Sequence, residues 1–388
     1  MKRRGGRTYR QRRQRLAAQE TQPGRAQRET KGRPCTDKTW SGLRSWCKAR
    51  GMPRTKLTLA YFPDTFRGMM ATRDIAAGED VVRVPESLLI TASKVRQLVA
   101  AGAPSASSCP SGSKPARWAL SEHQSLAYWL YAESEKHTRS EWHRYIDSLP
   151  RDFASVPLFT LAGDAPSSSG IAMDTREARW VMDHLPRPMQ QKAVEQHERL
   201  YSDWASTCRF LETLGLAVPA AWRRYVWAWL AVNTRCIHLG RRRPAASEVS
   251  ESCSASACVS LSSTQAIGSS DSMALAPVLD FLNHSEQADV VTFYDSVRRQ
   301  FVIRTNRPFS KGQEVFISYG PHDNRFMLLE YGFVLRQNPY QVLELDHAVG
   351  AWIDTAKSRS RAARRPNSGL MQPADIDALV DALKQHRL

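Results

Sequence analysis

The segment Leu275-Ala-Pro-Val-Leu-Asp-Phe-Leu-Asn-His-Ser285, together with Glu314-Val-Phe-Ile-Ser-Tyr-Gly320 further along, decides the fold of this chain. In the first segment an apolar run ends in the pair Asn283-His284, and in the second a strand-like run delivers Tyr319 ahead of a Gly-Pro turn. Asn and Ser are common in turns, so the triplet Asn-His-Ser alone is a weak signal. The two segments in this order, with Tyr319 35 residues after His284 and an Arg-Gly turn far upstream, form a much more specific pattern.

Length and composition set the first limits. A chain of 388 residues can bury a sizeable core, and one or two domains are expected. No apolar stretch reaches the ~18 residues of a membrane-spanning helix, and the basic N-terminus lacks the apolar part of a secretory signal. The seven cysteines are scattered without a CxxC pair. This usage fits reduced thiols in the cytosol or nucleus and predicts no bound metal.

Positive charge is concentrated at the N-terminus. Residues 1–33 hold twelve Lys or Arg residues against Glu20 and Glu29, so this segment carries +10 of the chain's net +17. It is too polar to offset the entropy cost of ordering, and we predict a disordered basic tail over residues 1–36. Because clustered Arg neutralises phosphates, the tail is a candidate nuclear localisation signal or contact with a nucleosome or nucleic acid. The alternative is a solvated arm without a dedicated partner.

Strand signals and helix signals alternate along the rest of the chain. Turn residues separate several β-rich runs, and we expect strands at Leu57–Phe62, Gly68–Thr72, Asp80–Val84, Asp289–Tyr294, Gln300–Thr305 and Val315–Ser318. Apolar residues at helical spacing predict helices at Trp40–Lys48, at 174–184, 189–214 and 219–238, and near 324–331. The Ser-rich stretch 241–272 is expected to be a mobile insertion.

These motifs resemble SET-domain methyltransferases, in which the Asn-His and Tyr segments thread together as a pseudoknot at the active site. The class most similar is the one typified by the plant Rubisco large-subunit lysine methyltransferase, through FRGMMATRDIAAGE, WAWLAVNTR, LAPVLDFLNHS and LLEYGFV. The resemblance implies an α+β fold, a SET-domain β-fold with a pseudoknot and a large helical insertion. Domain boundaries are expected at 1–36 for the tail, 37–335 for the SET domain with an insertion at about 95–238, and 336–388 for a helical remnant. The family's C-terminal substrate-binding domain is usually longer than this remnant.

The resemblance implies a protein-lysine N-methyltransferase that uses S-adenosylmethionine and acts on histone or non-histone proteins. Free Lys has a pKa near 10.4, so the site must deprotonate the amine and align it for in-line displacement. A tyrosine hydroxyl and inward-facing carbonyls can orient such an amine and polarise the methyl C–H bonds. Tyr319 holds that catalytic position in the resemblance; a core tyrosine that ends a strand is the plainer interpretation.

Cofactor-binding residues also follow from the resemblance, and Gly68 would allow the close backbone approach that the first of these segments needs. They are Thr65, Phe66, Arg67, Arg235, Asp280, Asn283, His284, Tyr331 and Phe333. Arg235 would pair with the cofactor carboxylate, and bidentate guanidinium–carboxylate pairing suits that task. Tyr331 and Phe333 would pack over the adenine. The sequence departs from the family at one point, because Thr65-Phe66 stands where relatives often have Glu-Gly.

Two other functions remain open at this stage. The first is a protein-histidine methyltransferase, since a structural relative methylates actin in that way. The second is a catalytically inactive SET-domain adaptor, although such proteins commonly lose the tyrosine or the Asn-His pair. We expect the protein in both nucleus and cytoplasm, with a protein substrate and no membrane association.

Overall fold

A computed structural model describes residues 31–102, 120–164, 166, 175–239, 272–342 and 355 of the 388. The chain divides into two compact units, residues 1–338 and 339–388. Most of the predicted basic tail, of the Ser-rich insertion and of the C-terminal remnant lies outside the described residues. The disorder predicted over residues 1–36 is wrong at its end, because Arg33–Pro34 form a short strand that pairs with Ala60 and Tyr61. Within the described part, no helix is long and apolar enough to cross a membrane.

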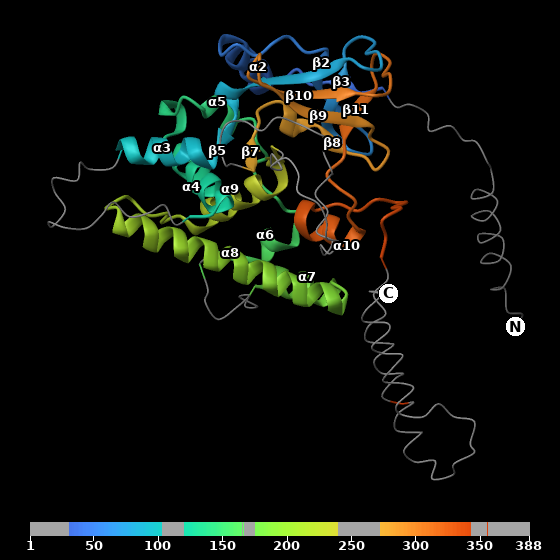
Figure 1. The fold of residues 1–388 in the computed structure, drawn as a ribbon. Coiled ribbons are helices and arrows are strands. Elements are labelled where there is room, and N and C mark those ends of the chain that lie inside the picture. Colours follow the sequence, from blue (N-terminus) through green and yellow to red (C-terminus); the bar gives the residue numbers. More distant parts are fainter. Residues whose placement is uncertain are drawn as a thin grey trace, which may run out of the picture. The chain divides into compact units, whose positions relative to one another are not determined.

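The first unit contains three small β-sheets (Figure 1). The five-stranded sheet has the order β1 (Arg33–Pro34), β2 (Leu57–Phe62), β3 (Phe66–Ala71), β11 (Glu314–Ile317) and β8 (Asn283–His284). The second sheet has the order β4 (Asp80–Pro85), β10 (Gln300–Thr305) and β9 (Val290–Asp295). The third, which the sequence did not predict, has the order β5 (Ile90–Thr91), β7 (Met273–Leu275) and β6 (Ile237–His238). The strands expected from the β-rich runs are therefore confirmed to within two residues at each end.

The helices are more numerous than predicted. They are α2 (Lys38–Ala49), α3 (Ala92–Gly102), α4 (Glu122–Glu135), α5 (His143–Ile146), α6 (Pro157–Leu161), α7 (Arg176–His184), α8 (Arg187–Thr213), α9 (Trp222–Arg235) and α10 (Asn324–Phe326). Short turns of 3-10 helix occur at η1 (Glu86–Leu88), η3 (His137–Arg139) and η4 (Leu279–Phe281), and one π-helical turn forms η5 (Met327–Tyr331). The predicted helices near 174–184, 189–214 and 219–238 correspond to α7, α8 and α9. The one predicted near 324–331 is divided into α10 and η5. The chain is thus α+β, as expected.

The aromatic stripe of α9 forms much of the helical core. Tyr225, Val226, Trp229 and Leu230 recur at helical spacing and are at most 1% exposed. They pack between α4 and α8, and Figure 1 shows α8 running beside α7 below the sheets. Burial of this apolar face is what stabilises helices of this length, because intrinsic helix propensity contributes little.

A parallel strand pair joins the two motif segments. β8 and β11 pair in parallel with Phe316 opposite Asn283 and Ile317 opposite His284, and the amide of Ser285 donates to the carbonyl of Ile317. β11 also pairs antiparallel with β3. The predicted Arg67-Gly68 turn is wrong by a few residues: the turn lies at Pro63–Thr65, and Arg67 and Gly68 belong to β3, where they pair with Tyr61 and Ala60. Three segments that are far apart in the sequence therefore meet at one place in the sheet.

Candidate active site

Tyr319 lies directly beyond β11 and contacts the Asn-His segment twice. Its hydroxyl donates to the carbonyl oxygen of Leu282 at 2.9 Å. Its backbone amide donates to Nδ1 of His284, also at 2.9 Å. Gly320 follows with a φ of 128°, a conformation that favours glycine, so the chain can turn away directly after the tyrosine.

The phenol of Tyr319 is neutral at physiological pH. Burial raises its pKa to about 12, against the opposing influence of the Arg235 charge. Since the only hydroxyl proton is directed at Leu282, the oxygen lone pairs stay available as acceptors. The site therefore presents an oriented phenol oxygen and a backbone carbonyl side by side.

His284 packs beside Tyr319, with the two ring centroids 5.3 Å apart. Its side chain is 7% exposed, and burial lowers the pKa of the imidazole to about 4. A neutral ring whose Nδ1 accepts the Tyr319 amide carries its proton on Nε2. That Nε2 is buried and has no hydrogen-bond partner among the described residues. No group of three or more metal-ligating side chains occurs in the described part of the chain.

Two guanidinium groups lie over the ring of Phe281. The central guanidinium carbon of Arg67 is 5.2 Å from the ring centroid and that of Arg235 is 5.4 Å from it. Arg235 Nη1 donates to the backbone carbonyl of Asp280 at 2.6 Å, and Arg67 Nη2 donates to that of Ser148 at 3.1 Å. Burial and the nearby Arg235 charge lower the pKa of Arg67. Two such cations in one partly buried region favour binding of an anionic group.

The carboxylate of Asp280 faces the core. It accepts the hydroxyl of buried Tyr145 at 2.8 Å, and burial raises its pKa to about 6. Its Oδ1 and the Nε of Arg235 are both buried without a partner in the described chain. Asp280 therefore lies next to the guanidinium groups, and its side chain accepts a hydrogen bond from Tyr145.

Asn283 binds the turn before β3 through its side-chain amide. Nδ2 lies 3.1 Å from the carbonyl oxygen of Arg67, 3.4 Å from that of Thr65 and 2.8 Å from Oε1 of Glu314. The hydroxyl of Thr65 donates to the other oxygen of the same Glu314 carboxylate. The hydrogen bonds that Asn283 donates thus connect the turn before β3 to β8 and β11.

Glu314 is the residue that sequence reasoning missed. Its carboxylate is partly buried, and burial raises its pKa. A Cβ atom at Gly68 would lie 2.0 Å from Glu314 Oε1, so only glycine leaves room for this carboxylate. The group that approaches Gly68 closely is therefore the Glu314 side chain, where the sequence had suggested the cofactor. A lone acidic residue at the start of the Glu-Val-Phe-Ile strand was the only available signal.

Phe66 occupies a strained backbone conformation at the tip of the turn. Its φ is 58°, in the left-handed region that costs a non-glycine residue about 1–2 kcal/mol. Its ring is 77% exposed. The glycine that the resemblance implies at this position would adopt this φ without that cost. In this chain the bonds that Asn283 and Glu314 make to Thr65 and Arg67 hold the turn on both sides of Phe66.

An aromatic wall formed by Tyr331 and Phe333 stands beside Tyr319. The ring centroids of Tyr331 and Tyr319 are 4.9 Å apart, and Phe333 is 6.2 Å from His284. Gly332 between them has a φ of 80°, which lets both aromatic residues turn toward the same centre. All ten residues named from the sequence thus lie in the neighbourhood of β8 and β11.

We expect Glu314→Ala to lower the free energy of unfolding by about 1–3 kcal/mol, because Asn283 and Thr65 would lose a partly buried acceptor. Thr65→Val, which removes only one of these bonds, should cost about 1 kcal/mol or less. Urea denaturation at pH 7 measures both. Equal midpoints for Glu314→Ala and the unmodified chain would contradict the role of this carboxylate.

The chain is similar in sequence to known proteins. The family model described as "SET domain" matches residues 67–320. SET domain-containing protein 4 of Mus musculus is 33% identical over 306 residues, which cover 77% of this chain and 59% of that protein. Ribosomal lysine N-methyltransferase set11 of Schizosaccharomyces pombe is 24% identical, covering 79% of this chain and 64% of the relative. Actin-histidine N-methyltransferase of Drosophila melanogaster is 26% identical, covering 86% and 56%.

A solved structure has the same fold. The SET domain of LSMT, crystallised with lysine and AdoHcy, superimposes with a TM-score of 0.52 at 16% identity, covering 84% of this chain and 65% of that one. The similarity expected from the sequence motifs is confirmed by these findings. The chain spans 59% of the length of the mouse relative.

Proposed function

The chain belongs to the SET-domain family, and from this premise we propose that it is an S-adenosylmethionine-dependent protein-lysine N-methyltransferase. The observation that carries the proposal is the bond between the Tyr319 hydroxyl and the Leu282 carbonyl. It places two oriented oxygens where the two motif segments meet.

The proposed chemistry needs alignment more than a strong base. S-adenosylmethionine supplies, when bound, a methyl group on a cationic sulfur. A lysine amine must be neutral to accept it, and desolvation next to positive charge lowers the amine pKa. The neutral Tyr319 phenol has lone pairs free to accept an N–H bond from that amine or a weak C–H bond from the methyl group. Holding the reacting groups in line is worth up to about 7–11 kcal/mol.

The residues present fit a zwitterionic cofactor. Buried polar atoms without a protein partner are costly unless a ligand satisfies them, and three of the predicted site residues have one: Arg235 Nε, Asp280 Oδ1 and His284 Nε2. Arg235 would hold the carboxylate, with Arg67 as the second cation over Phe281. The wall of Tyr331 and Phe333 would pack on the adenine. We therefore propose that Thr65, Phe66, Asp280 and Asn283 shape the cofactor site indirectly, by forming the turn before β3 or by holding it in place.

The acceptor residue is proposed to be lysine on a histone or non-histone protein. The name of the yeast relative points to a lysine of a ribosomal protein, and that of the fly relative to a histidine of actin. The crystallised LSMT domain holds lysine beside AdoHcy. Lysine is common to two of these, and histidine is the second candidate.

Transfer of a tritiated methyl group tests the proposal. The chain is incubated with labelled S-adenosylmethionine and histone octamers, ribosomal proteins or actin, and mass spectrometry maps the modified site. We expect label on a lysine ε-amine. Label on an imidazole would instead identify a histidine methyltransferase. A chain that neither transfers label nor binds S-adenosylhomocysteine in calorimetry would leave the inactive adaptor as the conclusion.

The basic tail is proposed to act in localisation or docking and not in methyl transfer. Residues 1–33 carry +10, whereas every proposed site residue lies beyond residue 60. Deleting residues 1–30, which precede β1, is expected to leave methyl transfer to a short peptide unchanged. The same deletion should reduce nuclear accumulation, seen by fluorescence microscopy, or flatten the salt dependence of nucleosome binding. Unchanged localisation and nucleosome binding would contradict this role.

A further inference from the structure

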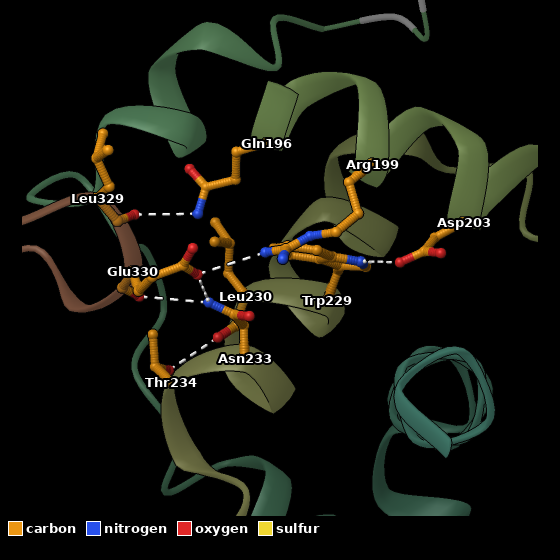
Figure 2. Close-up of polar contacts among 9 residues, drawn as sticks. All are labelled: Gln196, Arg199, Asp203, Trp229, Leu230, Asn233, Thr234, Leu329 and Glu330. Carbon is orange, nitrogen blue, oxygen red and sulfur yellow. Dashed lines mark hydrogen bonds and ion pairs between the residues drawn. The ribbon is translucent and has the colours of Figure 1, made fainter. Parts of the chain in front are cut away.

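The Tyr331–Phe333 wall adjoins the C-terminal end of η5, and the last carbonyl groups of η5 accept hydrogen bonds from the helical insertion. η5 ends at Tyr331, and the last carbonyls of a helix have no partner within it. Figure 2 shows that two side-chain amides from the inserted helices supply those partners. Gln196 of α8 donates to the Leu329 carbonyl at 3.2 Å, and Asn233 of α9 reaches the Glu330 carbonyl at 3.4 Å.

The side chain of Glu330 strengthens this connection. Its Oε2 accepts from Asn233 Nδ2 at 2.7 Å and from Arg199 Nη2 at 3.4 Å (Figure 2). The Arg199 side chain is 52% exposed, so the ion pair contributes little. The bond from Asn233 is shorter and partly buried. Asn233 is therefore the main link between α9 and η5.

Apolar packing holds the same segment to the insertion. Leu329 is 4% exposed and packs with Leu161, Leu185 and Met189. A Cβ atom at Gly332 would lie 2.8 Å from the backbone carbon of Ser155, so the residue between the two wall aromatics touches the inserted region directly. The position of the wall thus depends on the helical insertion.

Asn233 also stands two residues before Arg235 in α9. One turn of this helix consequently carries the guanidinium proposed for the cofactor carboxylate and the amide that anchors the wall. The proposed cofactor site needs both ends at a fixed separation, because a ligand that spans them gains from preorganised partners. The contacts between η5 and α9 set the separation between the wall and Arg235.

We propose that Asn233, through its bonds to Glu330, is a positioning residue that holds the Tyr331–Phe333 wall at a fixed place relative to Arg235. The inference rests on the proposed function and adds to it that the insertion sets cofactor affinity. Asn233 itself need not touch the cofactor. Loss of its bonds should loosen the wall while Arg235 and Tyr319 remain in place.

Asn233→Ala tests this with calorimetric binding of S-adenosylhomocysteine and with amide hydrogen exchange of residues 328–333. The expected result is a roughly five- to tenfold weaker Kd, equivalent to one net hydrogen bond, and faster exchange in that segment. Glu330→Gln keeps a carbonyl acceptor for the amide and should bind within about twofold of the unmodified chain. If Asn233→Ala does not fold, Glu330→Ala removes the same bond from the other side.

Asp203→Ala is the matched control. Asp203 of α8 accepts from Trp229 Nε1 of α9 at 2.8 Å, so it ties the same two helices without contacting η5 (Figure 2). This variant should lower the melting temperature and leave the Kd unchanged. Normal binding of S-adenosylhomocysteine by Asn233→Ala would overturn the inference about Asn233 but not the proposed function. The same holds if Asp203→Ala binds S-adenosylhomocysteine as weakly as Asn233→Ala does. An unmodified chain that does not bind S-adenosylhomocysteine would overturn the proposed function as well.

Discussion

Tyr319→Phe is expected to lower kcat for methyl transfer by about 10²- to 10³-fold, which is the usual cost of removing one oriented polar group from an active site. The substitution deletes only the oxygen that donates to Leu282 and that we propose to orient the acceptor amine. The ring contacts with His284 and Tyr331 would remain. We therefore expect the chain to fold, with about 1 kcal/mol of stability lost. Single-turnover rates with saturating S-adenosylmethionine measure the effect.

Tyr294→Phe is the control for this prediction. Tyr294 of β9, in the second sheet, is also a largely buried tyrosine at 8% exposure, and its hydroxyl donates to Glu86 of η1. Its removal should alter stability and leave the methyl-transfer rate unchanged. Equal rates for Tyr319→Phe and the unmodified chain would show that the phenol oxygen has no part in the reaction.

Arg235→Ala is expected to weaken S-adenosylhomocysteine binding by about 1–3 kcal/mol, because a charged ligand group would lose its buried hydrogen-bond donor. Arg304→Ala provides a matched control. The Arg304 guanidinium also lies over a phenylalanine, Phe293, and pairs with an aspartate, but it belongs to the second sheet. Calorimetry should find a normal Kd for that control. A normal Kd for Arg235→Ala would show that Arg235 only stabilises the C-terminal end of α9 and does not bind the cofactor.

The same substitution should change how stability depends on pH. The Arg235 charge lowers the pKa of Asp280, which burial raises from 3.8 to about 6, so its removal raises that pKa further. A raised native pKa means that the folded chain holds more protons than the unfolded chain, and stability from Asp280 falls as pH rises through this window. In the unmodified chain the fall covers pH ~4 to ~6. In Arg235→Ala it should extend above pH 6, as urea denaturation across pH 5–8 can test.

Local pattern was enough for most strands and for the family. The β-rich runs at Leu57–Phe62 and Gln300–Thr305 could be recognised because turn residues bound them and most of their side chains are buried. The aromatic stripe of α9 reflects which face of that helix is buried. The turn at Gly320 could also be anticipated, since Gly-Pro marks a turn in the sequence, whereas Gly68 lies within β3 and not in a turn. The short strands β5, β6 and β7 could not, because two or three residues contain no readable period.

The sequence by itself determined the family and the α+β class, and it named His284, Tyr331 and Phe333, whose rings pack around Tyr319. The tertiary structure alone decided what those residues contact. Asn283 was expected at the cofactor, yet its amide also holds the turn of Thr65 and Arg67; Glu314 meets Thr65 across 249 positions, and Asn233 meets Glu330 across 97. Periodicity reports only which side of an element is buried. Which distant partner fills that side depends on how the sheets and helices pack, and hydrogen bonds of this kind form only once that packing has removed the groups from water.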